Sequence, residues 1–511
     1  MVVNGTQLSF FGGVAEVGGN KLLLESKGSR IFLDFGMSFR QNQLYFSEFL
    51  NPRDGTAFGD LWRMGMLPRF RDDASVYRAD YLKHMKIEPG REAALDGVLL
   101  SHGHMDHVNY VEHLRPEIPI HLTPEADTIL SAIEATGGRE RGQFTRWYPS
   151  FELVPNKSEG GMRKATARDY PAQDRALRRM APQPFALGEF QVTPFGVDHS
   201  LPGAAAFVVE SHDARIVYTG DLRFHGRNGA LTRQFVERAA KHDVDALLVE
   251  GTRVQKTSEE VPEERVESEL RSIMEAAKGL VITNWPGRDV DRLTSMHLAA
   301  KSAGRRLVVD FKQALLLQHL QAAGLPAPRL GSDVDVFIPR SGWCTWGDDR
   351  FPRNVQDQDY YPWQRPFLDM ECALTPADLQ ATPSEYVWRC DYFSLHDLPD
   401  VDPPPGSVYV QSLTEPFNEE MVLDEKIVQN WLDRFALGPM KRTHASGHLN
   451  AEQLIDMIRA LRPKVVYPIH TGQPEEFRHI VEKANVDTRV VLPRAPTNEE
   501  AMKGEGFFRM S

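Results

Sequence analysis

The sequence predicts an α/β protein with more than one domain, and three observations support this prediction. The chain has 511 residues, which is more than a single hydrophobic core usually accommodates. Its first third consists largely of short apolar or alternating segments separated by glycines, a pattern typical of β-strands. From about residue 237, strand-like and helix-like segments alternate, which favours a parallel sheet with helices on its faces.

The elements expected in the first part of the chain are mainly strands. Paired glycines at 12–13 and 18–19 interrupt the apolar pattern and mark turns between the first strands. Strands are predicted over 7–11, 21–25, 30–35, 97–100, 190–197, 204–210 and 215–219. Residues 39–94 are rich in aromatic residues and contain prolines, so we interpret them as an insertion with short helices. A helix is expected over 108–114.

In the second part of the chain, helices and strands are predicted in alternation. Apolar positions at helical spacing predict helices over 263–277, 289–303, 312–323, 419–435 and 451–461. Strands are predicted over 245–250, 280–284, 306–310, 407–412 and 464–469. Residues 340–405 are rich in Trp, Pro, Asp and Tyr, and we interpret them as a second, irregular insertion.

Composition limits the class of protein. The net charge of −12 argues against a broad non-specific nucleic-acid binder, which is usually basic, but not against a metal-centred site. No apolar run is long enough to span a bilayer, and no basic segment followed by an apolar block opens the chain. The cysteines Cys344, Cys372 and Cys390 lack C-x-x-C spacing, so we expect buried thiols and a cytoplasmic location.

The most informative motif is S-H-G-H-M-D-H at residues 101–107, directly after the apolar segment 97–100. His102 and His104 are two positions apart, so both project to the same side of an extended strand end. Asp106 and His107 follow where the chain must turn. Imidazole nitrogen and carboxylate oxygen suit zinc or manganese, so the motif predicts a site that can serve two adjacent metals.

Three further side chains follow predicted strands and extend this set. Asp221, His199 and His470 each stand at or just after a strand end. Alone, each has a structural interpretation, because a single histidine there is usually only hydrogen-bonded and an aspartate often forms a turn. Together with residues 102–107 they provide enough ligands for two metals with a water between them.

Two early segments resemble a known family. The sequence G-G-V-A-E-V-G-G-N at 12–20, followed by I-F-L-D-F-G at 31–36, resembles the opening of metallo-β-lactamase-fold hydrolases. The motif at 102–107, His199 and Asp221 match the successive metal motifs of that superfamily.

Later residues narrow the resemblance to the β-CASP nucleases, and among them to ribonuclease J. Glu250 in L-V-E-G-T resembles the first β-CASP motif, His448 in H-A-S-G-H the second, and His470 the third. The resemblance implies an αββα metallo-β-lactamase sandwich with an inserted β-CASP domain, a parallel sheet flanked by helices. It places the first part of the sandwich at 1–236, the inserted domain at 237–440, and the last part of the sandwich at 441–511.

The resemblance also implies a ligand assignment for two Zn²⁺ ions, with Mn²⁺ or Mg²⁺ as alternatives, and Asp221 would bridge the two. One ion would be held by His102, His104, His199 and Asp221. The other would be held by Asp106, His107, Asp221 and His470.

The implied activity is that of a metal-dependent ribonuclease. An activated hydroxide would hydrolyse RNA phosphodiester bonds in 5′-to-3′ exonuclease or endonuclease mode, leaving 5′-phosphate ends. Asp106 would also orient the nucleophile, His448 would contact the phosphate or protonate the leaving group, and Glu250 would fix His448. The resemblance further implies an RNA partner and, by family analogy, allows a homodimer. No membrane association is expected, since no apolar run is long enough to span a bilayer.

The loop before His448 is a candidate for phosphate binding. An imidazole, a hydroxyl and glycine-permitted backbone N–H groups lie close together in His444, Ser446 and Gly447. An ordinary loop before the helix at 451 is the alternative. Arg292 is a further candidate to face the substrate groove.

Three other functions remain open from the sequence alone. A DNA nuclease or another phosphodiesterase could use the same ligand set. A small-molecule hydrolase such as a lactonase or thioesterase is disfavoured, because such enzymes lack the inserted domain and His448. A non-catalytic RNA-binding protein is disfavoured by the intact ligands.

Overall fold

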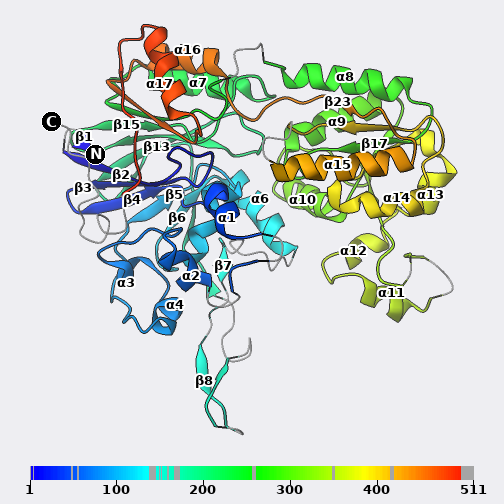
Figure 1. Ribbon diagram of the computed structural model, residues 1–511, viewed down its shortest axis with the longest axis horizontal. Helices are drawn as coiled ribbons and strands as arrows, with labels where there is room; N and C mark the ends of the chain where they lie inside the picture. The colour runs from blue at the N-terminus through cyan, green and yellow to red at the C-terminus, as the bar shows by residue number, and fades with distance from the viewer. Residues whose placement is uncertain are drawn as a thin grey trace.

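The computed structural model describes residues 2–3, 5–47, 50–53, 57–136, 145–148, 150, 152–157, 160–165, 173–255, 260–343, 345–347, 351–414 and 419–496. Within these ranges the strands form three seven-stranded sheets and two sheets of two strands. Figure 1 shows two lobes, one built on the first two sheets and the other on the third sheet with its helices.

The first sheet has the strand order β1-β2-β3-β4-β5-β6-β11. Strands β1 to β4 pair antiparallel, and β4, β5, β6 and β11 pair parallel. The strands are β1 (Val2–Val3), β2 (Thr6–Gly12), β3 (Lys21–Ser26), β4 (Ser29–Leu33), β5 (Gly97–Leu99), β6 (Ile120–Leu122) and β11 (Leu177–Arg179).

The second sheet has the order β12-β13-β14-β15-β16-β24-β25. Strands β12 to β15 pair antiparallel, whereas β15, β16, β24 and β25 pair parallel. The strands are β12 (Phe185–Leu187), β13 (Phe190–Gly196), β14 (Ala205–Glu210), β15 (Arg215–Tyr218), β16 (Ala246–Glu250), β24 (Val465–Ile469) and β25 (Arg489–Val490).

These two sheets pack face to face. Their shared core joins Phe10 and Leu22 of the first sheet to Phe207, Leu248 and Tyr467 of the second. Helices cover the outer face of the first sheet: α2 (Ala57–Arg63), α3 (Asp73–Val76), α4 (Ala79–His84), α5 (Met105–Val108), η1 (Asn109–His113) and α6 (Pro124–Ala135). Others cover the outer face of the second: α7 (Gly229–Ala239), α16 (Ala451–Leu461) and α17 (Pro474–Lys483). This arrangement confirms the predicted αββα sandwich.

The third sheet is parallel throughout and has the order β20-β19-β18-β21-β17-β22-β23. Its strands are β17 (Val281–Asn284), β18 (Arg306–Val309), β19 (Val334–Phe337), β20 (Ala373–Leu374), β21 (Tyr386–Arg389), β22 (Val408–Gln411) and β23 (Lys441–Arg442). One face packs on α8 (Glu263–Ala276), α9 (Val290–Ser302), α10 (Phe311–Ala322) and α12 (Arg365–Leu368). The other face packs on α13 (Pro376–Ala381), η3 (Tyr392–Asp397), α14 (Leu398–Val401) and α15 (Glu419–Arg434). A parallel sheet flanked by helices is therefore confirmed as well.

Smaller elements complete the two lobes. Helix α1 (Phe39–Tyr45) has no buried residue, while α11 (Arg353–Asp359) and η2 (Pro383–Glu385) belong to the second lobe. Strand β7 (Trp147–Tyr148) pairs with β10 (Gln173–Asp174). Strand β8 (Leu153–Pro155) pairs with β9 (Met162–Lys164) in a hairpin that projects from the first lobe in Figure 1.

Two sequence expectations need correction. The segment 340–405 is not irregular throughout, because β21 lies in the middle of the third sheet between β18 and β17. A short buried parallel strand shows no alternation, so the Pro- and Asp-rich flanks concealed it. The helix expected over 108–114 is instead the α-helical turn α5 followed by the 3₁₀ segment η1.

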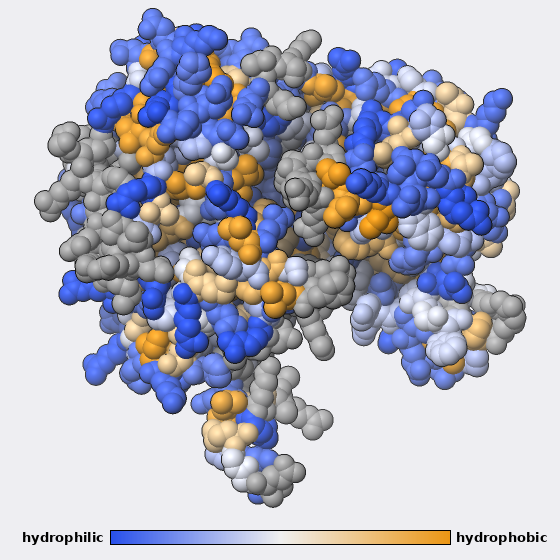
Figure 2. Space-filling model, viewed as in Figure 1, coloured by the Kyte–Doolittle hydropathy of each residue, from blue (hydrophilic) through white to orange (hydrophobic). Residues whose placement is uncertain are grey.

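Two further findings concern the surface and the thiols. Cys372 and Cys390 are buried free thiols, as expected, and Cys344 lies outside the described residues. Among the residues that the structure describes, no helix is both long and apolar enough to cross a bilayer. The face seen in Figure 2 is largely hydrophilic, with hydrophobic side chains gathered over part of α15, where Val422, Leu423 and Ile427 are exposed.

Candidate metal centre

Strand direction brings the predicted ligands to one edge of the sandwich. In the second sheet, β15, β16 and β24 are parallel, and β13 runs the same way because both it and β15 are antiparallel to β14. Residues that follow these strands therefore meet at the same edge. They include His199 after β13, Asp221 after β15, Glu250 at the end of β16, and His470 after β24. In the first sheet, β5 delivers His102 in the same way.

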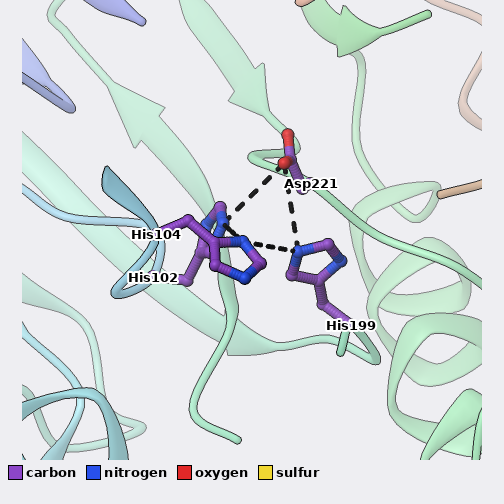
Figure 3. Close-up of side chains that lie close together, drawn as sticks. All are labelled: His102, His104, His199 and Asp221. Carbon is purple, nitrogen blue, oxygen red and sulfur yellow. Dashed lines mark hydrogen bonds and ion pairs between the residues drawn. The ribbon is translucent and has the colours of Figure 1, made fainter. Parts of the chain in front are cut away.

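The first ligand group consists of His102, His104, His199 and Asp221, whose ligand atoms lie within 4.8 Å of one another. Figure 3 shows the three imidazoles and the carboxylate converging on one point. His104 Nδ1 lies 2.9 Å from His102 Nε2 and 3.2 Å from His199 Nε2. Asp221 Oδ2 lies 3.7 Å from His102 Nε2 and 4.0 Å from His199 Nε2.

The second group shares Asp221 with the first. Asp106, His107 and His470 form a cluster of possible ligands, and His470 Nε2 lies 3.1 Å from Asp106 Oδ2. Asp221 Oδ2 lies 3.3 Å from His107 Nε2 and 3.5 Å from His470 Nε2. Asp221 Oδ2 thus faces both groups, which places this carboxylate between them.

The donor set fits divalent cations. Burial, followed by the charges of neighbouring imidazoles, lowers the pKa of His102, and burial likewise lowers the pKa of His104 to about 4. Neutral imidazole nitrogens therefore face one another at hydrogen-bond distance, which is the state required of metal ligands. His107 Nε2 and Asp221 Oδ1 are buried without a hydrogen-bond partner. Coordination of a cation would satisfy such buried polar atoms.

Charges near the second group also favour a cation. Burial opposes ionisation of Asp106, but the nearby His107 and His470 outweigh it and lower the pKa of the Asp106 carboxyl. The pKa of Asp221 is likewise held well below its usual value by His470 and His107, against the effect of burial. Both carboxylates are therefore ionised at neutral pH and available as ligands.

Asp34, which lies in the I-F-L-D-F-G segment at 31–36, supports the second ligand group. It is completely buried, and its Oδ2 accepts hydrogen bonds from His107 Nδ1 at 2.7 Å and from Tyr218 OH at 2.5 Å. Its Oδ1 accepts from the Ser101 N–H at 2.7 Å. Because the Nδ1–H of His107 donates to Asp34, the other ring nitrogen, Nε2, faces the centre.

The glycine-rich segment after β2 encloses Asp106. The Asn20 N–H donates to the Asp106 carbonyl at 3.0 Å, and the His470 N–H donates to the Gly13 carbonyl at 2.8 Å. A Cβ on Gly18 would lie 2.5 Å from Asp106 Oδ2, and one on Gly36 would lie 1.7 Å from the Asp106 carbonyl oxygen. Gly18, one of the glycines predicted to mark turns, and Gly36 are therefore required for close approach to a ligand.

His448 and Glu250 form a hydrogen-bonded pair beside the second ligand group. His448 Nδ1 lies 2.9 Å from Glu250 Oε2 and 3.9 Å from Asp221 Oδ2. The other Glu250 oxygen accepts from the Leu222 N–H at 2.9 Å. Burial favours neutral His448, but the charge and hydrogen bond of Glu250, with Asp221, raise its pKa to about 9. His448 can therefore hold a proton at neutral pH.

Side chains from both lobes hold the carbonyl groups of the loop 443–448. Ser412 Oγ donates to Thr443, Arg292 Nη2 to Ala445, Arg223 Nη1 to Ser446, His199 Nδ1 to Gly447, and Arg253 Nη1 to His448. These hydrogen bonds occupy carbonyl oxygens that would otherwise repel an anion. Arg223 was not predicted from the sequence, because its partners Asp198, just after β13, and Asp291, in α9, come from different lobes.

The structure places the proposed phosphate-binding residues in this loop. Ser446 and Gly447 are partly exposed, and His444 Nδ1 lies 3.3 Å from Arg292 Nη1. Burial, with the Arg292 charge, lowers the pKa of His444 to about 3, so it would contact phosphate as a neutral donor. Arg292 was expected from the sequence to face the substrate groove, and this expectation is wrong. The side chain is fully buried and pairs with Glu263 at 2.7 Å.

Comparisons with known proteins agree with this fold. A family model described as "Beta-lactamase superfamily domain" matches residues 73–284. Ribonuclease J of Mycoplasma genitalium is 22% identical over 487 residues, covering 94% of this chain and 70% of the relative. Ribonuclease J of Mycobacterium tuberculosis H37Rv is 24% identical over 482 residues, covering 91% and 69%.

A solved structure has the same fold over nearly its whole length. It is a protein of unknown function from Enterococcus faecalis V583, with a TM-score of 0.68 and 22% identity, covering 96% of this chain and 98% of that one. The chain therefore has the metallo-β-lactamase fold and is ribonuclease J-like over more than nine tenths of its length.

Proposed function

We propose that this protein is a metal-dependent ribonuclease that hydrolyses RNA phosphodiester bonds and leaves 5′-phosphate ends. The observation that carries the proposal is the convergence of two ligand groups on Asp221, with the His448–Glu250 pair beside them. The similarity to ribonuclease J over most of the chain supports RNA as the substrate.

We propose that the first ion is held by His102, His104, His199 and Asp221, and the second by Asp106, His107, Asp221 and His470. Zinc suits this mixture of imidazole and carboxylate ligands best, with manganese or magnesium as alternatives. Two such cations would activate a water as nucleophile and neutralise charge that develops on the phosphoryl group.

The surrounding residues would position the reaction. Asp34 holds His107 with Nε2 toward the centre, and Asp106 would accept a hydrogen bond from the attacking water and so orient it. His448, protonated because of Glu250, can donate its Nε2 proton to a non-bridging oxygen or to the leaving 3′ oxygen. In the loop, His444, Ser446 and Gly447 would bind phosphate, as the hydrogen-bonded carbonyl groups permit.

The domain boundaries remain proposals. We propose 237–440 as the inserted domain, between sandwich segments 1–236 and 441–511. Strand pairing favours a start after β16, which belongs to the second sheet, and an end after β23, which belongs to the third. A cytoplasmic location and a homodimer also remain predictions, and light scattering of the purified protein tests the second.

The test is a substrate comparison with zinc or manganese. End-labelled RNA, DNA of the same sequence and a lactone are incubated with the wild type, and cleavage of RNA with 5′-phosphate products is expected. Preferential cleavage of DNA, or ester turnover without nucleic-acid cleavage, would contradict the proposal. Circular RNA and RNA with 5′-mono- or triphosphate ends then separate endonuclease from 5′ exonuclease action.

Variants assign the roles. Asp106→Ala and His104→Ala should abolish turnover and reduce bound metal. His448→Ala should keep its metal and lose roughly 10²- to 10⁴-fold in rate, if His448 transfers a proton. A fully active His448→Ala protein would refute that role.

A further inference from the structure

Thr252 connects a proposed metal ligand to the proposed proton donor. It lies directly after β16, where its Oγ1 is 2.6 Å from Glu250 Oε2 and 2.8 Å from His470 Nδ1. Glu250 in turn pairs with His448 Nδ1 at 2.9 Å. A continuous chain of hydrogen bonds therefore runs from His470 through Thr252 and Glu250 to His448.

The single hydroxyl proton of Thr252 determines which group donates in each hydrogen bond of this chain. A threonine hydroxyl has one proton, and an ionised carboxylate can only accept. The short contact with Glu250 uses that proton, since a charged acceptor binds it more strongly than the neutral His470 carbonyl at 3.2 Å. Toward His470 the hydroxyl must then accept, so Nδ1 carries the imidazole proton.

In the neutral imidazole that a metal would require, this assignment leaves His470 Nε2 without a proton. Nε2 is the atom that lies 3.1 Å from Asp106 Oδ2 and 3.5 Å from Asp221 Oδ2, at the second ligand group. A lone pair there is what a metal requires, and a hydrogen bond to the other ring nitrogen selects that tautomer.

The same hydroxyl fixes Glu250. Glu250 Oε2 accepts hydrogen bonds from both Thr252 and His448, while Oε1 accepts one from the Leu222 N–H. The rings of His448 and His470 lie 5.6 Å apart at an angle of 30°, with no direct hydrogen bond between them. Their relative position is therefore set through Glu250 and Thr252.

We propose that Thr252 is a positioning residue that selects the metal-binding tautomer of His470 and holds Glu250 in place against His448. The inference rests on the proposed metal site and ribonuclease activity. The position of Thr252 itself is set by the backbone, because the preceding Gly251 donates to the Ile469 carbonyl at 3.1 Å. A Cβ on Gly251 would lie 2.6 Å from the Phe477 ring, so this backbone is held closely.

The experiment replaces only the hydroxyl. Thr252→Val keeps the shape of the half-buried side chain, whereas Thr252→Ser keeps the hydroxyl and removes the methyl group. Thr488→Val is a matched control, because Thr488 is also half-buried and its hydroxyl donates to the Pro463 carbonyl. Zinc affinity is measured by chelator competition, and kcat and KM on 5′-monophosphate RNA.

Thr252→Val is expected to weaken the second zinc about 10- to 100-fold and to lower kcat by a similar factor, with KM little changed. Thr252→Ser and Thr488→Val should both behave like the wild type. Wild-type zinc affinity in Thr252→Val, or an equal defect in Thr252→Ser, would overturn the proposal. If the wild type cleaves no RNA, the proposed function fails, whereas the zinc measurements still test Thr252.

Discussion

Gly18→Ala should remove metal from the centre without touching a ligand. Gly18 has a φ of +79°, and an added Cβ would lie 2.5 Å from Asp106 Oδ2 and 2.7 Å from Asp106 Cβ. Ordinary van der Waals contact begins at 3.4 Å, so Asp106 and Gly18 must separate by roughly 0.9 Å. Metal–ligand distances tolerate only about 0.2 Å of change.

Two effects of the substitution can be separated by magnitude. The left-handed backbone conformation costs a non-glycine residue about 1–2 kcal/mol, which lowers stability but does not move Asp106. Mutation of a residue that only orients a metal ligand typically weakens metal binding roughly 10- to 100-fold. Displacement of the ligand Asp106 itself should weaken it at least as much.

Gly28 offers the matched control. Its φ is +90°, and no atom lies within 4 Å of an added Cβ, so Gly28→Ala introduces backbone strain without a clash. Both variants should melt at lower temperature than the wild type, but only Gly18→Ala should lose zinc in chelator competition and elemental analysis. Wild-type metal content in Gly18→Ala would show that the loop does not enclose Asp106 as described.

Three further predictions concern stability. Burial raises the pKa of Glu134 from 4.5 to about 7, although hydrogen bonds from backbone N–H groups act to lower it. Between these two pH values the folded state keeps a proton that the unfolded state has lost. Stability should therefore fall as the pH rises through this window, and Glu134→Gln should gain up to about 3 kcal/mol over the wild type at about pH 8 but not at about pH 4, as judged from melting curves. Arg292→Met would leave the fully buried Glu263 with Arg223, at 3.9 Å, as its remaining cationic partner and should cost about 3–5 kcal/mol in denaturant unfolding, so an unchanged midpoint would contradict a role for this ion pair. A chelator should lower the melting temperature of the loaded protein, because free metal at about 100 times its Kd stabilises the fold by roughly 2.7 kcal/mol; no shift would count against the metal centre.

The ligands could be predicted where the chemistry is local in the sequence. Residues 102–107 carry their own signal, because several donors occur within one turn after an apolar segment. His199, Asp221 and His470 needed the resemblance, since each alone is an ordinary residue at a strand end. The strand order then explains why they converge, because β13, β15 and β24 point to one edge.

The supporting residues could not be predicted in this way. Thr252 lies over His470 only because β16 and β24 are neighbours, although the two residues are far apart in the chain. Arg223 gains its role from Asp198 in the first lobe and Asp291 of α9 in the second, and neither spacing nor periodicity marks it. The strand β21 escaped prediction for a related reason, since a short strand buried on both faces has no alternating pattern.

An acidic protein that binds RNA requires a local source of positive charge, and we propose that bound metal would provide it at this site. Arg223 and Arg292 are completely buried and paired with carboxylates, so they cannot attract a distant phosphate. Asp106 and Asp221 are ionised and would repel it until two divalent cations more than neutralise them. His448→Ala, expected to keep its metal, should therefore bind RNA in the loaded form and lose most of that affinity with a chelator, as measured by fluorescence anisotropy. Equal affinity in both forms would place the RNA-binding charge outside the metal centre.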